Sequence, residues 1–435
     1  MGLKSFQIVF ENPTQTYYSG ETVSGRVVLS LNSSKSIRGI VIKFKGEANV
    51  HWTENESRKN SDGTTEEHTV YFQGNEKYFE SKYHLVGGRA DEMVLPEGEH
   101  CFPFSTVLPP KLPSSFEGEF GHIRYTVKVV VDRPWKFDHE IKSAFTVISP
   151  VDLNTHETAK NPSMQEVEKR FCCLCCESGP LTMALSLPVT GYVPGQDIPV
   201  TIEIDNASNV CVTDVKCKLK KVCGKLITFI ATSPYGSSRE EELTVSEVIF
   251  DSVQPRHSNT ATQKMTVPPL PPSDLDNCEI IDLAYYLKVV AEVSGCHNAL
   301  KTSAPIIIGT IPLTSYQPVF TPMPMEGGNV SGGIGWTVPS LGSEAQSPYV
   351  QPSIRPQGEP DCVPSAPPPD GGEKYKQPHT PFHGSTSLSY PDIPPPTFTE
   401  SFFGPQNIQD AEDSQYIQGN LNYVPKYPVY NFVSK

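Results

Sequence analysis

The sequence predicts an all-β protein with two tandem immunoglobulin-like β-sandwich domains, followed by a disordered, proline-rich C-terminal tail. Three observations lead to this prediction. Short segments alternate apolar and polar residues, and turn-forming Gly, Pro, Asn and Ser separate them. The same order of segments occurs twice within residues 1–313. From Thr314 onward the alternation stops, and half of the chain's 42 prolines lie in that last stretch.

The expected strands combine β-branched residues with a period of two. Examples are Thr22–Leu31 (TVSGRVVLSL), Ile37–Glu47 (IRGIVIKFKGE) and Ile123–Asp132 (IRYTVKVVVD). Such alternation places one set of side chains in a core and the other toward solvent. Several short strands of this kind, spaced by turn residues, are typical of sandwiches and barrels.

An internal repeat divides these strands into two domains. Tyr18–Leu29 resembles Val193–Ile204, which begins 175 residues further on, and an alternating strand follows each copy. Later in each copy a proline-rich stretch leads into an aromatic strand, at Leu108–Asp132 and Val267–Val293. Sandwich strands can converge on similar patterns by chance, but the agreement in order and spacing favours duplication.

The repeat and the change in composition give the expected boundaries. We expect a first sandwich at residues 1–150, a linker at 151–180, a second sandwich at 181–313 and the tail at 314–435. Within the linker, SMQEVEKRF predicts one helical turn, for which Ser163 is the candidate N-cap.

Charge and hydropathy narrow the class of protein. The formal net charge is −14, which argues against nucleic-acid binding because such proteins present basic surfaces to phosphate. The N-terminus does not have the pattern of a signal peptide, and no stretch approaches the roughly 20 apolar residues that would span a bilayer. We therefore expect a cytoplasmic protein whose eleven cysteines stay reduced.

Several motifs resemble the arrestin domain-containing proteins (alpha-arrestins), nearest to the subgroup that includes thioredoxin-interacting protein. In order along the chain, the motifs lie at Tyr17–Leu29, Phe102–Val129, Pro150–Asn154, Cys172–Met183, Gly191–Ile198 and Ala304–Leu313. The resemblance implies paired arrestin-type β-sandwiches. It also implies an adaptor that bridges membrane-protein cargo to WW-domain ubiquitin ligases and so directs endocytosis, sorting and degradation at the plasma membrane and endosomes.

The tail has a composition that favours disorder and recognition by peptide-binding domains. It contains 11 acidic and 5 basic residues together with its prolines, so it has little apolar surface to offset the entropy of ordering its backbone. Pro364, Ser365, Ala366 and Pro367 form a P-S/T-A-P motif, which implies an interaction with the ESCRT machinery. Coincidence is the alternative, because four residues are a short pattern in a tail rich in Pro and Ser.

Two further tail patterns are less complete. Pro395, Pro396, Thr397 and Phe398 approach the PPxY motif that WW domains bind, but Phe stands where Tyr is required and the chain has no intact PPxY. Loss of the hydroxyl's hydrogen bond costs about 0.5–1.5 kcal/mol. Tyr430 and Val433 satisfy the loose Y-x-x-hydrophobic sorting pattern, which disordered tails also contain by accident.

Four cysteines in the expected linker form the densest cluster of reactive side chains, namely Cys172, Cys173, Cys175 and Cys176. Clustered cysteines beside apolar residues are candidates for palmitoylation and peripheral membrane association. Zinc binding, thiolate catalysis and plain burial as small apolar residues are the alternatives. The single intervening residue between the two pairs disfavours zinc.

No catalytic constellation is recognisable: the sequence has no P-loop, no Rossmann glycine pattern and no G-x-S-x-G. We expect no enzyme activity, metal or cofactor, but an adaptor whose lobes hold cargo, phospholipid or another arrestin. The alternative is a structural subunit of a retromer-like endosomal coat, which would have little use for a motif-bearing tail.

Overall fold

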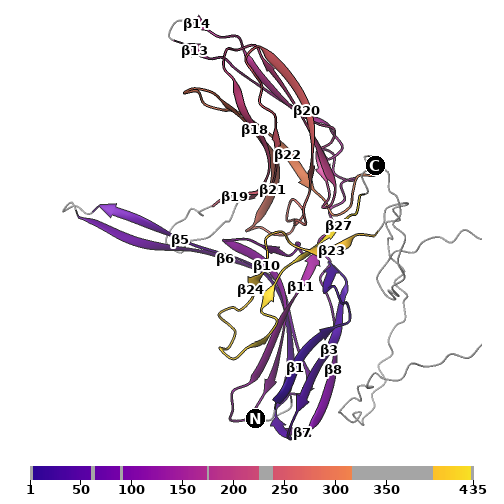
Figure 1. Ribbon diagram of the computed structural model, residues 1–435. Coiled ribbons are helices and arrows are strands. Elements are labelled where there is room, and N and C mark those ends of the chain that lie inside the picture. The colour runs from indigo at the N-terminus through magenta and orange to yellow at the C-terminus, as the bar shows by residue number, and fades with distance from the viewer. Residues whose placement is uncertain are drawn as a thin grey trace, which may run out of the picture.

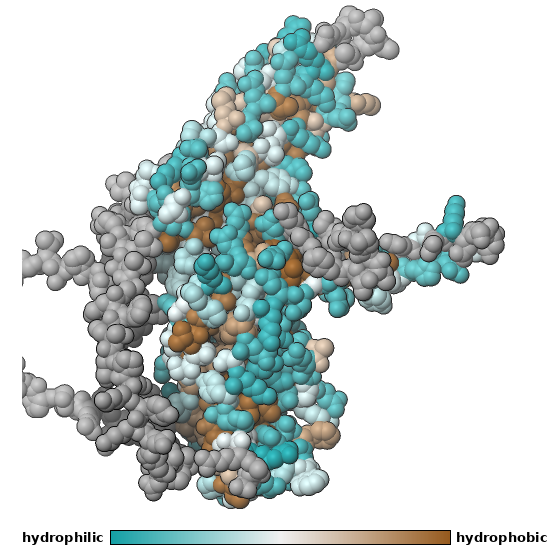
Figure 2. Space-filling view, turned by 180° about the vertical axis from the view of Figure 1, so that it is seen from behind, coloured by the Kyte–Doolittle hydropathy of each residue, from teal (hydrophilic) through white to brown (hydrophobic). Residues whose placement is uncertain are grey.

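The computed structural model describes residues 3–59, 64–88, 92–173, 176–224, 239–315 and 395–432. They form two β-sandwich lobes joined end to end, with strands from the tail lying across the junction and along the first lobe (Figure 1). The fold class expected for the first 313 residues is confirmed. Hydrophilic residues dominate the surface seen from behind, where hydrophobic residues appear as separate patches (Figure 2).

The first lobe, called the N-lobe, packs a small sheet on a large one. The small sheet has the order β1-β3-β8, with bounds Leu3–Phe10, Thr22–Leu31 and Gly98–Val107. The large sheet has the order β2-β11-β10-β5-β6, with bounds Thr16–Tyr18, His139–Ile148, Gly121–Asp132, Gly39–Lys59 and Thr65–Gly87. Two short additions are β9 (Phe116–Glu117) on β10 and the pair β4 (Lys35–Ile37) with β7 (Met93–Leu95).

The second lobe, the C-lobe, repeats this plan. Its first sheet has the order β12-β15-β17-β20, with bounds Ser163–Lys169, Leu181–Leu187, Asp197–Asn206 and His257–Thr266. Its second sheet has the order β16-β22-β21-β18-β19, with bounds Gly191–Tyr192, Leu300–Ile308, Asp282–Val293, Val212–Gly224 and Glu241–Phe250. A separate hairpin pairs β13 (Cys172–Cys173) with β14 (Cys176–Glu177).

Equivalent residues make the same bonds in both lobes, as expected of a duplication. The hydroxyl of Tyr125 in β10 donates to the carbonyl of Pro113 at 2.6 Å, and that of Tyr285 in β21 donates to Pro271 at 2.9 Å. A short strand runs parallel to the last strand in each lobe, as β2 beside β11 and β16 beside β22. In the turn that follows each short strand, Gly20 and Gly195 have φ values of +86° and +88°, which suit glycine.

The helical turn expected at Ser163 is wrong. Residues 163–169 form the edge strand β12, which pairs antiparallel with β15 from Ser163 opposite Leu187 to Lys169 opposite Leu181. These residues, expected in a linker, therefore belong to the C-lobe sheet.

The prediction of disorder throughout the tail is also wrong for residues 395–432. They form five short strands, β23 (Thr397–Glu400), β24 (Gln406–Asn407), β25 (Gln418–Gly419), β26 (Asn422–Tyr423) and β27 (Lys426–Val429). We call residues 395–432 the docked segment. Tyr430 belongs to the buried apolar cluster that continues through both lobes, so the end of the tail is part of the folded core.

Candidate functional site

Four lysines gather on the outward face of the large N-lobe sheet because of strand register. Along β10, odd-numbered residues such as Val127 point into the core, so Lys128 points outward. Lys142 on β11 and Lys43 on β5 lie directly opposite Lys128, and Lys45 lies opposite Thr126. We call this set the lysine face. Like charges placed side by side destabilise a sheet unless opposite charges meet them.

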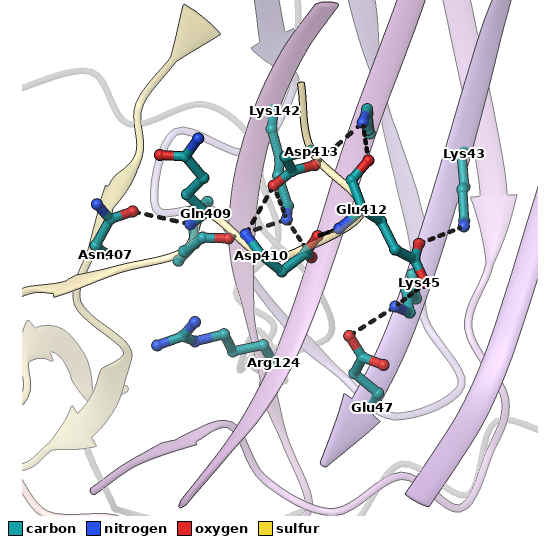
Figure 3. A network of polar contacts seen from close by, with 12 residues as sticks. Lys43, Lys45, Glu47, Arg124, Lys142, Asn407, Gln409, Asp410, Glu412 and Asp413 are labelled. Carbon is teal, nitrogen blue, oxygen red and sulfur yellow. Dashed lines mark hydrogen bonds and ion pairs between the residues drawn. The ribbon is translucent and has the colours of Figure 1, made fainter. Parts of the chain in front are cut away.

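The docked segment supplies those opposite charges through an acidic turn that contains Asp410, Glu412 and Asp413. Lys142 Nζ donates to the Ile408 carbonyl at 2.9 Å and lies 2.6 Å from Asp410 Oδ2 and 2.7 Å from Asp413 Oδ2 (Figure 3). The side chains of Lys142 and Asp413 are only 3% and 1% exposed. All three donors of this ammonium are thus used inside the protein.

The ionised form of Asp413 is favoured despite its burial. Desolvation opposes the charge, but hydrogen bonds from Lys142 Nζ, from the backbone N–H of Asp410 and from Lys128 Nζ, together with the Lys142 charge, hold its pKa below the ordinary value. Lys128 Nζ lies 3.1 Å from Asp413 Oδ1 and 3.0 Å from Glu140 Oε2, and these contacts raise its pKa although burial opposes the charge.

The outer part of the lysine face is more exposed. Glu412 lies 3.3 Å from Lys43 and 3.4 Å from Lys45, while its own side chain is 64% exposed. Asp410 Oδ1 accepts a hydrogen bond from the Glu412 N–H at 3.0 Å, which fixes the shape of the acidic turn. Exposed pairs of this kind contribute about 0–1 kcal/mol, so the buried contacts at Lys142 distinguish the site.

Backbone contacts continue the docking along β11. Strand β25 pairs parallel with β11, where Gln418 lies opposite Ile141 and Gly419 opposite Lys142. Gly419 has a φ of +114°, and a Cβ there would lie 2.2 Å from the Lys142 carbonyl oxygen. Glycine is therefore required for the tail backbone to approach the sheet this closely.

Tyrosines of the docked segment then join the two lobes. The Tyr427 hydroxyl donates to the Ser115 carbonyl of the N-lobe at 2.9 Å, and the Tyr430 hydroxyl donates to Thr310 of the C-lobe at 2.8 Å. Both tyrosines are buried, at 1% and 4% exposed. The Tyr430 N–H donates to the Pro194 carbonyl at 3.0 Å, which binds this backbone to the C-lobe.

A buried lysine marks the point where the three parts of the chain meet. Lys221, in β18 of the C-lobe, is 1% exposed and lies 4.0 Å from Glu241. Its Nζ lies 3.9 Å from the ring centroid of Phe403 in the docked segment and 5.3 Å from that of Phe116 in the N-lobe. Burial lowers its pKa. The two rings provide cation–π contacts for this lysine.

The tail motifs predicted from sequence have different locations. Pro395 is exposed and Pro396 half-buried, while Thr397 and Phe398 lie in β23, which pairs antiparallel with β27. The Phe398 ring contacts Tyr18 at a centroid distance of 6.5 Å. Tyr430 is buried as described above. Pro364, Ser365, Ala366, Pro367 and Val433 lie outside the described residues, and all of these motifs stay predictions.

The cysteine hairpin lies at the far end of the C-lobe, away from the docked segment (Figure 1). Cys173 lies opposite Cys176 in the β13–β14 pair, with Cys172 beside them, whereas Cys175 is outside the described part of the chain. Among described residues, no group of three or more His, Cys, Asp or Glu is placed to hold a metal ion. In the same residues, no helix has the length and apolar character needed to cross a bilayer.

The lysine face and the acidic turn were missed at the level of sequence. Residues 406–424 contain no proline, unlike the flanking parts of the tail, and they include the alternating run YIQGNLNYV. That proline-free run is the signal that indicates an ordered segment. The partners of the acidic turn could not be identified in this way, because they lie more than 250 residues earlier in the chain.

Comparison with known proteins agrees with this architecture. Residues 6–154 match the family described as "Arrestin (or S-antigen), N-terminal domain", and residues 177–313 match "Arrestin (or S-antigen), C-terminal domain". These matches coincide closely with the two lobes.

Curated relatives extend the similarity to whole chains. The chain is 31% identical to "Arrestin domain-containing protein 17" of Caenorhabditis elegans, over 98% of this chain and 99% of that relative. It is 30% identical to "Arrestin domain-containing protein 4" of Mus musculus, over 72% and 74% of the two chains. It is also 30% identical to "Arrestin domain-containing protein 1" of Rattus norvegicus, over 83% and 73%. The chain therefore belongs to the arrestin domain-containing protein family.

Proposed function

We propose that this protein is a non-enzymatic adaptor that links membrane-protein cargo to ubiquitination, endocytic and ESCRT sorting machinery, peripherally at the plasma membrane and endosomes. Family membership supports the adaptor role. The observation that carries the proposal is the docked segment, which bonds to both lobes through buried groups. A tail attached in this way would keep its motifs on the same molecule as the surface that would hold cargo, and release of the β23–β27 pair would free the motif at Pro395–Phe398.

The chemistry of the lobes, the tail and the cysteine hairpin suggests a separate role for each. The sandwich lobes provide large rigid surfaces, which suit folded or extended segments of cargo. The motif at Pro364–Pro367 would recruit ESCRT components, and the tail would recruit WW-domain ligases directly, through the degenerate motif at Pro395–Phe398, or through a partner arrestin. The cysteine hairpin at the end of the C-lobe would carry lipid.

Proximity labelling with matched variants tests the proposal. We compare the full chain, a chain truncated after Ser315 and the double variant Pro364→Ala, Pro367→Ala. We expect the double variant to lose ESCRT components alone, and the truncation to lose ligases as well. If the truncated chain keeps the full set of partners, the adaptor role is wrong and the retromer-like coat subunit is favoured.

A further inference from the structure

Two aromatic side chains stand out from the N-lobe in the loop between β10 and β11. Trp135 is 98% exposed and Phe137 is 77% exposed. Large aromatic rings are normally buried, because they carry 150–250 Å² of surface that folding removes from water. It is therefore unusual that two such rings are exposed to solvent in one six-residue loop, Arg133–Asp138.

The backbone conformation of this loop is also unusual. Trp135 has a φ of +59°, in the left-handed region that glycine and asparagine adopt more easily than a bulky residue. Glycine at position 135 would relieve the strain and remove the exposed ring at the same time. Tryptophan at this position therefore costs stability through its backbone strain and gains none from burial of its ring, and backbone strain of this kind clusters at functional sites.

Hydrogen bonds hold the loop closed and the rings outward. The Arg133 N–H donates to Asp138 Oδ1 at 2.9 Å, and Arg133 Nε donates to the Phe137 carbonyl at 2.8 Å. Tyr416 of the docked segment, 53% exposed, contacts Phe137 at a ring-centroid distance of 5.6 Å. The aromatic cluster thus consists of Trp135, Phe137 and Tyr416 on a defined support.

The position of the loop favours contact with a flat surface over the binding of a ligand in a pocket. Arg133 lines a small cavity with Lys35 and with Leu95 of β7, at the end of the N-lobe where β7 is labelled, opposite the end of the C-lobe that carries the cysteine hairpin (Figure 1). A protein partner needs about 800 Å² of each surface, which a convex tip offers less readily than a sheet face. Aromatic rings on a protruding tip suit the boundary of a bilayer, where tryptophan and tyrosine are enriched.

We propose that the loop Arg133–Asp138, together with Tyr416, is a membrane-contact site whose rings enter the interfacial layer of a lipid bilayer. The local charge is mixed: Lys136 is exposed, but Asp132 pairs with Arg38 at 2.8 Å and Asp138 accepts from Arg133. The formal net charge of −14 opposes anionic membranes. Burial of the rings therefore dominates the contact, which neither the adaptor role nor lipidation of the cysteines requires.

Vesicle flotation of the full chain tests the site. The wild type is expected to float with phosphatidylcholine vesicles and to stay bound in 0.5 M salt, because ring burial is insensitive to screening. Trp135→Ser with Phe137→Ser should weaken binding by about tenfold or more. The matched control, Met164→Ser with Ile249→Ser, removes apolar residues that are 64% and 58% exposed elsewhere, and should bind as the wild type does.

A second variant separates binding from folding. Trp135→Gly should raise the melting temperature, since it relieves the left-handed strain, while it weakens vesicle binding. Brominated phosphatidylcholine should quench tryptophan fluorescence in the wild type and lose most of that effect in Trp135→Phe. The site is excluded if the wild type does not float, if the double-serine variant binds unchanged, or if binding requires anionic lipid and low salt. Loss of sorting partners on truncation would test the proposed function separately.

Discussion

Lys142 is the most deeply buried contact of the acidic turn, because its ammonium meets two carboxylates and a carbonyl while its side chain is only 3% exposed. A buried ion pair adds modest net stability compared with an apolar replacement of both partners, yet removing one partner is costly since the other charge is left buried. Lys43 meets the same acidic turn at its exposed edge. These two lysines therefore provide a matched comparison at one site.

Lys142→Met should release the acidic turn. It leaves Asp413 buried without its main partner, and loss of one member of a buried pair costs about 3–5 kcal/mol. Lys43→Met removes an exposed contact and should cost about 0–1 kcal/mol. Hydrogen exchange of residues 408–423 measures the difference as lost protection in the first variant only. Equal loss of protection in both would show that the buried network does not hold the segment.

Acid should weaken the same contact. The pKa of Asp413 is depressed in the folded protein, so its contribution is complete above the ordinary aspartate pKa and is lost as pH falls through the depressed value. Protection of residues 408–423 should therefore be constant near neutrality and decline in strongly acidic solution. In Asp413→Asn this acid-dependent decline should be smaller; an undiminished decline would assign the effect to other carboxylates.

At the scale of elements, the pairing of β23 with β27 limits the access of a peptide-binding domain to the motif that β23 contains. Its residues Thr397–Glu400 form a ladder with Lys426–Val429, and the Phe398 ring meets the Tyr18 ring edge to face. A WW domain binds its ligand as a free extended peptide, so it competes with this ladder. A WW domain that binds Pro395–Phe398 would therefore have to open the β23–β27 ladder.

Phe398→Tyr tests this competition because it completes a PPxY motif. In a peptide of residues 391–402, the new hydroxyl should improve WW-domain affinity several-fold to about tenfold. In the full chain the gain should be smaller, since binding must first break the β23–β27 ladder. Isothermal titration of both forms measures the two gains. Equal gains would indicate that the ladder presents no barrier.

Elements also differ in how well sequence reasoning predicts them. The alternation in Ile123–Asp132 is set by one buried face, and the observed strand β10 covers the same residues. Residues 163–169 contain Met, Gln, Glu and Lys, which favour helices, but pairing with β15 overrides this weak preference. The docked segment is ordered by contacts with Lys142, Ser115 and Thr310, which are distant in sequence, so its proline-free run can indicate order but cannot identify these partners.

At the scale of the whole molecule, the docked segment acts as a third structural part between the lobes. Lys221 of the C-lobe, Phe116 of the N-lobe and Phe403 of the docked segment meet at one buried point. The duplicated sandwiches could be predicted from the repeat at Tyr18 and Val193, whereas this junction could not, since it depends on how three separate segments assemble in space. The relative position of the lobes is thereby linked to tail docking.

Ser315 follows the C-lobe and Pro395 begins the docked segment, which bonds to both lobes through Tyr427 and Tyr430, so the chain meets a folded part of the molecule at both of these residues. Cutting the chain at a protease site engineered between Ser315 and Pro395 should give two fragments that elute together until denaturant is added, because the docked segment stays bonded to the lobes; separate elution under native conditions would contradict this. If a sorting factor binds Pro364–Pro367, force on that motif would then reach the C-lobe through Ser315 and the junction between the lobes through the docked segment.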